Sequence, residues 1–172
     1  MNWRWAGVVG VLLGLLSVPA ALSAPNGTAQ HFAQDFYDWY GKVALSDAKD
    51  PAWVVALKLR KTDFDPELTR LLKEDADAQA HCGELVGLDF DPILNSQDPA
   101  DHYVAGKLVR KRRRYLIEVL AVRNGTKSTT PDVTAEFSGD GRHFVFINFH
   151  YPDGGDLLSI LRSPRPECSV PK

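Results

Sequence analysis

The sequence contains little cysteine and no large excess of charge of either sign. Cys82 and Cys168 are the only cysteines among 172 residues, which excludes a disulfide-rich scaffold. Twenty basic residues stand against 22 acidic ones, for a formal net charge of −2 at pH 7. Because a balance this mild gives no general attraction to nucleic acid, no nucleic-acid partner is predicted.

The motifs of common catalytic and metal sites are also missing from the sequence. The chain has no G-x-S-x-G, no H-E-x-x-H and no phosphate-binding loop, and its five histidines do not recur at metal-ligand spacing. Asp89 and Asp91 begin an acidic stretch, but an EF-hand would need glycine at Leu94 and glutamate at Ala100. We therefore predict no cofactor, no metal and no motif-defined catalytic residue.

The first 23 residues have the pattern of a secretory signal peptide. Arg4 is their only charge, Ala6 to Val18 is almost wholly apolar, and residues 21–23 fit the small-x-small rule for cleavage. Pro19 and the short apolar run argue against a permanent membrane anchor. The predicted mature chain is a single domain, residues 24–172, that is periplasmic or secreted and has no stable membrane anchor.

The two cysteines are expected to pair, because pairing is the default in an exported chain. A Cys82–Cys168 disulfide would join the C-terminal tail to the end of a helical region. In the chain-entropy model, closing so long a loop stabilises the fold by roughly 4–5 kcal/mol. The alternative is that both residues are buried thiols.

Helical spacing dominates the first half of the chain. Gln30 to Ala44 is predicted as a helix whose aromatic residues pack across a sheet. Asp50-Pro51 and Asp65-Pro66 each place a capping carboxylate before a proline, so helices are predicted to begin at Pro51 and Pro66. The later turns of the third helix, residues 74–80, are expected to be exposed. An ordered irregular loop is predicted for residues 83–101.

The second half alternates apolar and polar residues with the period of β-strands. Strands are predicted at residues 102–109, 115–122, 133–138 and 142–151, followed by a short closing helix. In the last strand the two-residue period puts Phe146, Asn148 and His150 on one face, and Phe149 on the other. Helices followed by an antiparallel meander make an α+β fold, in which N-terminal helices pack on a curved antiparallel sheet.

Two sequons for glycosylation begin at Asn26 and Asn124, and they matter only in a host that glycosylates. Asn124-Gly125 has a second interpretation, since this dipeptide is typical of a tight hairpin turn.

Several polar side chains are candidates for lining a ligand pocket on the concave side of the sheet. Asn148 and His150 turn one strand face polar, although neighbouring backbone or a wet edge could satisfy them instead. Tyr37 and Tyr40 are the helix residues best placed to present a hydroxyl, although they could equally be core residues. The predicted ligand set is Tyr37, Tyr40, Asp91, Asn95, Asn148 and His150. The enzymatic alternative pairs His150 with Asp38 or Asp91 as acid and base.

The stretch from Lys107 to Arg114 is the most lopsided in charge, since six of its eight residues are basic. It is interpreted either as a solvated hairpin tip that blunts edge pairing or as a contact for phosphate groups, anionic polymers or an acidic partner. No aromatic residue lies inside the run, so base stacking is not supported. The predicted surface for an anionic partner consists of Lys107, Arg110, Lys111, Arg112, Arg113 and Arg114.

Three segments carry a resemblance to a known family: YDWY at 37–40, LDFDPILNSQD at 88–98 and FINFHYPDGGDLLSIL at 146–161. Together they resemble the bacterial family called domain of unknown function 3828. That resemblance covers nearly the whole mature chain and implies an exported protein with an α+β cone similar to NTF2. The family has no settled function, so the resemblance implies no catalytic residues.

The sequence therefore favours a non-catalytic exported protein of the envelope. One version binds a small apolar ligand inside the cone, and another binds an envelope protein, as an inhibitor or immunity protein does. An enzyme of the isomerase or hydrolase type, with acid and base in the cone, is the remaining alternative. A hollow cone would favour the ligand, and a filled cone with an exposed patch would favour the protein. The oligomeric state is not predicted.

Overall fold

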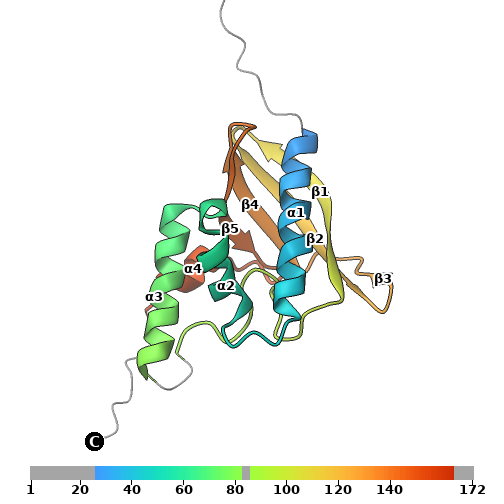
Figure 1. Ribbon diagram of the computed structural model, residues 1–172. Coiled ribbons are helices and arrows are strands. Elements are labelled where there is room, and N and C mark those ends of the chain that lie inside the picture. The colour runs from blue at the N-terminus through green and yellow to red at the C-terminus, as the bar shows by residue number, and fades with distance from the viewer. Residues whose placement is uncertain (1–25, 83–85, 165–172) are drawn as a thin grey trace, which may run out of the picture.

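The structure is a computed structural model that describes residues 26–82 and 86–164 (Figure 1). Its helical elements come first: α1 (Asn26–Ala44), α2 (Ala52–Leu59), the 3-10 turn η1 (Lys61–Asp63) and α3 (Pro66–Cys82). The strands follow: β1 (His102–Lys111), β2 (Arg114–Arg123), β3 (Thr126–Lys127), β4 (Val133–Gly139) and β5 (Phe144–His150). A short helix, α4 (Leu157–Arg162), comes last. The predicted α+β class is confirmed.

All strand pairs are antiparallel, in the order β1-β2-β4-β5, with β3 paired to β2. The sheet is open and curved, and α1 lies across it (Figure 1). The register shifts once in the β1–β2 pair and once in the β4–β5 pair, and such bulges bend a sheet. Helices packed on a curved antiparallel sheet are what the sequence predicted and what an NTF2-like cone requires.

Side chains and backbone from the helical half cover both edges of the sheet. The Gln34 amide accepts from the Ala105 N–H at 2.8 Å and donates to the Tyr103 carbonyl at 3.0 Å, both on edge strand β1. On the other edge, the Asp65 N–H donates to the Phe146 carbonyl of β5 at 2.8 Å. These bonds occupy backbone groups that an uncovered edge would offer to another chain.

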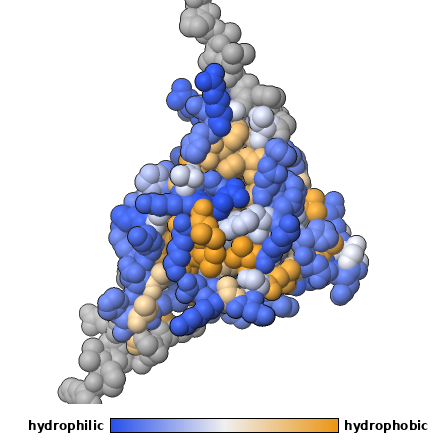
Figure 2. Space-filling view, viewed as in Figure 1, coloured by the Kyte–Doolittle hydropathy of each residue, from blue (hydrophilic) through white to orange (hydrophobic). Residues whose placement is uncertain are grey.

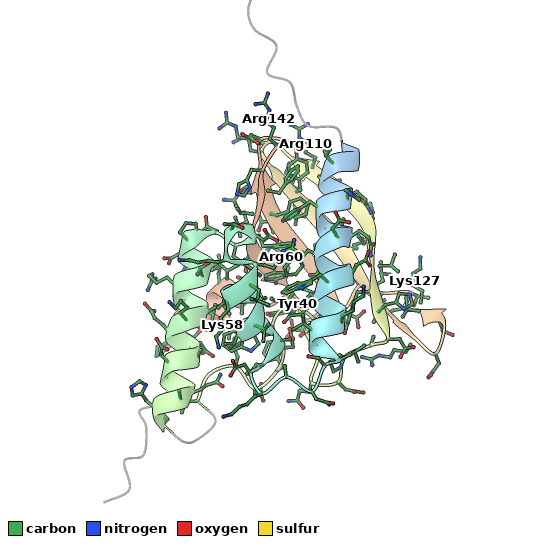
Figure 3. All side chains as sticks on the ribbon, viewed as in Figure 1. Tyr40, Lys58, Arg60, Arg110, Lys127 and Arg142 are labelled. Atoms are coloured by element: carbon green, nitrogen blue, oxygen red, sulfur yellow. The ribbon has the colours of Figure 1, made fainter. Side chains whose placement is uncertain are left out.

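Aromatic rings fill the space between α1 and the sheet. Phe36 and Phe146 are fully buried with ring centroids 4.6 Å apart, and Phe146 also contacts Phe137 and Phe149. The Arg60 guanidinium covers this core at 5.7 Å from the Phe36 ring (Figure 3). The space between α1 and the sheet is therefore filled by protein side chains, which is the filled alternative of the two that the sequence left open.

A bulge at Ile147 overturns the predicted faces of β5. Phe137 pairs with Phe146 while the neighbouring Glu136 pairs with Asn148, so Ile147 is the extra residue on β5. Because one extra residue reverses the alternation, Phe146 and Phe149 end on the same core side, with their rings stacked at 5.5 Å. The prediction that Phe146 shares a face with Asn148 and His150 is wrong.

The helix starts confirm one capping prediction and correct another. The Asp65 carboxylate accepts from the Glu67 N–H at 2.9 Å, as predicted for the start of α3. The Asp50 carboxylate does not cap α2; it pairs instead with the Lys58 ammonium at 2.6 Å, on the exposed surface. Asp50 and Lys58 are eight positions apart in the sequence, so this ion pair joins the segment before α2 to the end of the helix.

Two further sequence predictions are settled by the backbone. Asn124 and Gly125 have φ of 51° and 72° and join β2 to β3, which confirms the tight turn. The later turns of α3 are not uniformly exposed, because Asp75 is only 1% exposed.

The predicted disulfide, the predicted signal peptide and its predicted cleavage site stay untested. Cys82 ends α3, but Cys168 lies outside the described residues, so the disulfide remains a prediction. The signal peptide and its cleavage after residue 23 also lie outside them. Within the described part of the chain, no helix has both the length and the apolar character needed to cross a bilayer.

Apolar side chains gather in the middle of one face of the molecule, over α2 (Figure 2). Leu59 is 70% exposed, and Leu45, in the connection that precedes α2, is 53% exposed. Val54 and Val55, also on α2, are half-buried. We call Val54, Val55 and Leu59 the α2 patch.

Candidate functional site

Four tyrosine hydroxyls hold the long loop between α3 and β1. Tyr37 donates to the Ile93 carbonyl at 3.2 Å and Tyr151 donates to the Pro92 carbonyl at 3.0 Å. Tyr40 donates to the Asp91 carboxylate at 2.7 Å, and Tyr103 accepts from the Ala100 N–H at 2.9 Å. We call residues 86–101 the tyrosine-bound loop. Since its backbone bonds run to buried hydroxyls, a segment without regular secondary structure is held in one shape.

Asp91 is the polar centre of this loop. One carboxylate oxygen accepts from the backbone N–H groups of Ile93 and Leu94, at 2.9 and 3.1 Å, and the other accepts from Tyr40. Burial raises the pKa of Asp91 to about 6, although the three hydrogen bonds favour the charged form and oppose the rise. Burial, together with the Asp91 charge, raises the pKa of Tyr40 well above its ordinary value, so this hydroxyl remains a donor at neutral pH.

The other end of the loop is fixed to α3 through Asp75. Its buried carboxylate accepts from the Leu88 N–H at 3.3 Å and from the Gln79 amide at 2.8 Å. The Gln79 amide also donates to the Leu88 carbonyl at 2.9 Å. Sequence analysis missed this arrangement, because the bonds depend on how the loop folds back over the helix.

Gly87→Ala is expected to lower the free energy of unfolding by roughly 3 kcal/mol, because two penalties add. Gly87 has φ of +97°, and a Cβ built there would lie 2.2 Å from an Asp75 oxygen. Gly154 has φ of +90° and nothing within 4 Å of such a Cβ, so Gly154→Ala is the matched control for strain alone. Urea denaturation should therefore show a clearly smaller loss of unfolding free energy for Gly154→Ala. Equal losses would mean that the Asp75 side chain moves aside at little cost.

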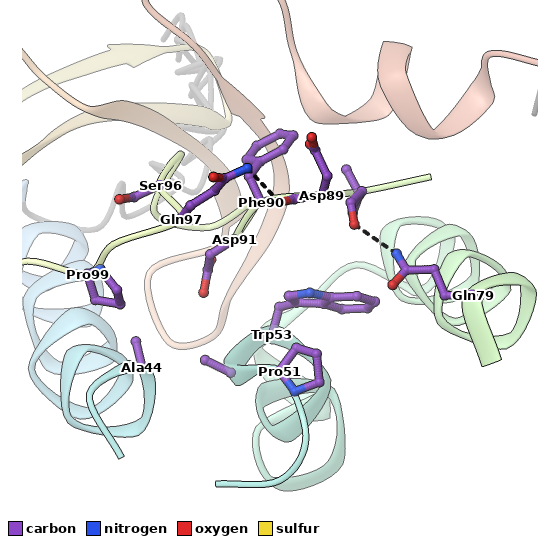
Figure 4. Close-up of a pocket in the computed structure, with 12 residues that line it drawn as sticks. Ala44, Pro51, Trp53, Gln79, Asp89, Phe90, Asp91, Ser96, Gln97 and Pro99 are labelled. Carbon is purple, nitrogen blue, oxygen red and sulfur yellow. Dashed lines mark hydrogen bonds between the residues drawn. The ribbon is translucent and has the colours of Figure 1, made fainter. Parts of the chain in front are cut away.

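A hollow of about 520 Å³ opens between the tyrosine-bound loop and the start of α2 (Figure 4). Trp53 lies below Asp91 and Phe90 in this view, and Gln79 reaches in from α3. The described residues that line it include no lysine, arginine or histidine; they are Ala44, Pro51, Ala52, Trp53, Gln79, Leu88, Asp89, Phe90, Asp91, Ser96, Gln97 and Pro99. The hollow thus combines two carboxylates, two aromatic rings and two amides.

The rim of the hollow is partly ordered by the loop itself. The Gln97 amide donates to the Asp89 carbonyl at 3.0 Å, and the Asp91 N–H donates to the Ser96 carbonyl at 2.9 Å. The side chain of Asp89 is exposed, whereas Asp91 is half-buried and its carboxylate is occupied by three donors. Asp89 is therefore the lining carboxylate that is open to solvent, at the rim of the hollow.

The predicted ligand residues fall into separate groups. Tyr37, Tyr40 and Asp91 are brought together, but as supports of the loop. Asn95 is turned away from this cluster, where its amide donates to the Asp132 carbonyl at 3.0 Å. Asn148 donates to the Asp156 carboxylate at 2.8 Å, next to the start of α4. The expected single pocket ringed by these residues does not form.

His150 belongs to a second polar group, on the side of the sheet away from the aromatic core. Its imidazole lies 2.9 Å from the Glu136 carboxylate, and the Arg114 guanidinium lies 2.9 Å from the other Glu136 oxygen. Asp38 is exposed on α1 and accepts from Gln34. His150 thus pairs with Glu136 rather than with Asp38 or Asp91, and the acid–base pair considered from the sequence is not assembled.

Comparison with known proteins gives no match to this chain among family models, curated proteins or solved structures. The resemblance to the family called domain of unknown function 3828 therefore stays an expectation that rests on the three sequence segments. Among the described residues, no three His, Cys, Asp or Glu side chains are grouped so that they could hold a metal ion.

Proposed function

We propose that this protein is a non-catalytic exported binding protein and that it takes a small organic cation in the hollow beside the tyrosine-bound loop. The observation that carries the proposal is the lining of that hollow, where Asp89 and Asp91 lie beside Trp53 and Phe90 and no described lining residue is basic. A cationic group is attracted both by carboxylates and by aromatic faces. Neutral or anionic molecules gain less binding free energy from these carboxylates and aromatic rings.

The stiffness of the loop also supports a binding role. Three tyrosine hydroxyls and the Asp75 carboxylate bind its backbone, and the Tyr40 hydroxyl binds the Asp91 side chain, before any ligand arrives. A site that is already in its bound shape loses less conformational entropy on binding. Small-molecule sites are mostly pre-formed hollows with a few placed polar groups, and this hollow has that composition.

The expected result with choline and putrescine as probes is saturable binding that raises the melting temperature, whereas glucose and glutamate should have little effect. Asp89→Asn should weaken binding of the cations by roughly fivefold, because it removes the exposed carboxylate. Asp47→Asn, an exposed carboxylate outside the lining, is the matched control. Titration calorimetry measures both affinities. Equal binding of cationic and neutral probes, or none, would contradict the proposal.

A second candidate is a protein partner, and a specific observation favours it. The cone is filled by rings such as Phe146, and Leu59 of the α2 patch is exposed, as is Leu45 in the connection before α2. Exposed apolar groups of this kind are typical of contact surfaces, including those of inhibitor or immunity proteins. This candidate becomes the better one if no cationic probe binds.

A further inference from the structure

One end of the molecule gathers basic residues from two hairpins. The β1–β2 hairpin turns at residues 112–113, with Lys111 paired to Arg114. Arg114 in turn pairs with Ser138, and Gly139 pairs with Phe144, so the β4–β5 turn lies at the same end of the sheet. That turn adds Arg142, and Figure 3 shows Arg110 and Arg142 at this end. We call Lys107, Arg110–Arg114 and Arg142 the basic tip.

Most charges of the basic tip face solvent without a carboxylate partner. All seven residues are exposed, and among the described residues only Arg114 forms an ion pair, with Glu136. The Arg110 guanidinium lies over the Tyr115 ring at 5.5 Å and donates to the Arg112 carbonyl at 3.1 Å. Glu136 offsets part of the Arg114 charge, and the Arg142 charge contributes to the lowered pKa of Asp140, but the five basic residues Lys107 and Arg110–Arg113 form no ion pair with a described residue.

Arg112, at the β1–β2 turn, has a backbone conformation that arginine rarely adopts. Its φ is 58°, in the left-handed region that glycine or asparagine adopts with less strain. The second two-residue turn, Asn124-Gly125, uses the favourable residues. Arg112 therefore adds a positive charge at a turn position where glycine or asparagine would be less strained.

The basic tip lies at the end of the molecule where α1 begins. The Gln30 amide donates to the Gly106 carbonyl at 3.0 Å, and Thr28 and His31 line a shared hollow with Gly141 and Arg142. The chain that precedes α1 therefore joins the fold at the end that carries the basic tip.

We propose that the basic tip docks the protein onto the surface of an anionic phospholipid bilayer. The two adjacent hairpin turns lie at the end of the sheet, so their basic side chains can contact the phosphate groups of a flat membrane surface together. Val109 is 38% exposed beside the charges and gives the tip an apolar contact for the interface. In this orientation α1, with 19 residues, places the hollow at its far end about 28 Å from the bilayer, open to solvent.

Sedimentation with lipid vesicles tests this docking, using residues 24–172, which contain every described element without the apolar run. The protein should bind vesicles that contain about one third phosphatidylglycerol, and the binding should weaken severalfold as salt rises to about 0.5 M. It should not bind pure phosphatidylcholine. Changing Arg110, Lys111, Arg112 and Arg113 to Gln should weaken binding at least about a hundredfold, since each basic residue near an anionic surface contributes about fivefold.

A matched control separates the tip from total charge. Lys42, Lys49, Lys73 and Lys127 are exposed and lie outside the tip, and changing them to Gln removes the same charge. This control should bind nearly as the parent protein does, and both variants should melt near the parent temperature because exposed charges contribute little stability. Equal loss in the two variants, or no preference for anionic vesicles, overturns the proposal. Binding of soluble polyphosphate without binding of vesicles overturns it also, in favour of an anionic polymer.

Discussion

Phe146→Ala and Phe149→Ala are each expected to lower the free energy of unfolding by about 3–5 kcal/mol, the range for removing a fully buried ring. Both rings are 0% exposed and lie in contact with each other, so each change removes buried ring contacts. Val145→Ala is the control on the same strand, because Val145 is half-buried, and it should cost about 1 kcal/mol. Urea denaturation gives all three values.

The double variant tests the bulge at Ile147 directly. The two rings are stacked at 5.5 Å, so each single change already removes their mutual contact. The loss in the double variant should fall short of the sum of the single losses by roughly 0.5–1.5 kcal/mol. On a regular strand the rings would point to opposite faces and the losses would add. Additivity within about 0.5 kcal/mol would therefore contradict the bulged arrangement.

Asp91 is expected to make the protein less stable as the pH rises from about 4 to about 7. Its pKa is about 6 in the folded protein, against 3.8 for an ordinary aspartate, so folding favours the protonated form. The stabilisation is complete below pH 3.8 and is lost as the pH rises through 6. A difference of roughly 2 pH units corresponds to about 3 kcal/mol.

Asp91→Asn is expected to remove this dependence. An amide side chain can still accept from the N–H groups of Ile93 and Leu94, but it does not ionise. The stability of the variant relative to the parent should rise with pH between 4 and 7, by up to about 3 kcal/mol. Other carboxylates, such as Asp156, whose pKa is lowered, also make stability depend on pH. Their contributions cancel when the two proteins are compared at each pH, because both proteins contain them.

Tyr40→Phe serves as the partner variant for this measurement. Because the Tyr40 hydroxyl donates to the charged carboxylate and lowers its pKa, its removal should move the Asp91 transition to higher pH. Denaturation midpoints across the pH range report both effects. A relative stability of Asp91→Asn that does not change with pH would show that water reaches the carboxylate and that the loop opens.

The order of elements and several of their ends could be predicted from the sequence. Asp65-Pro66 starts α3, Asn124-Gly125 turns a hairpin, and alternation places β2 and β4. These features depend on residues within a few positions of one another, and local backbone preference decides them. The basic residues of the β1–β2 hairpin were also visible in the sequence, since six of the eight residues from Lys107 to Arg114 are basic.

The site depended on tertiary structure. Tyr40 and Asp91 are 51 positions apart, and only the packing of α1 beside the loop joins them. An extra residue in β5, revealed by the register with β4, moved Asn148 and His150 away from the core that holds Phe146. Asp75 is buried because the loop folds over α3, and Arg142 joins the basic tip because two hairpins end together. Each outcome is set by burial and hydrogen bonds between distant segments, which no local pattern encodes.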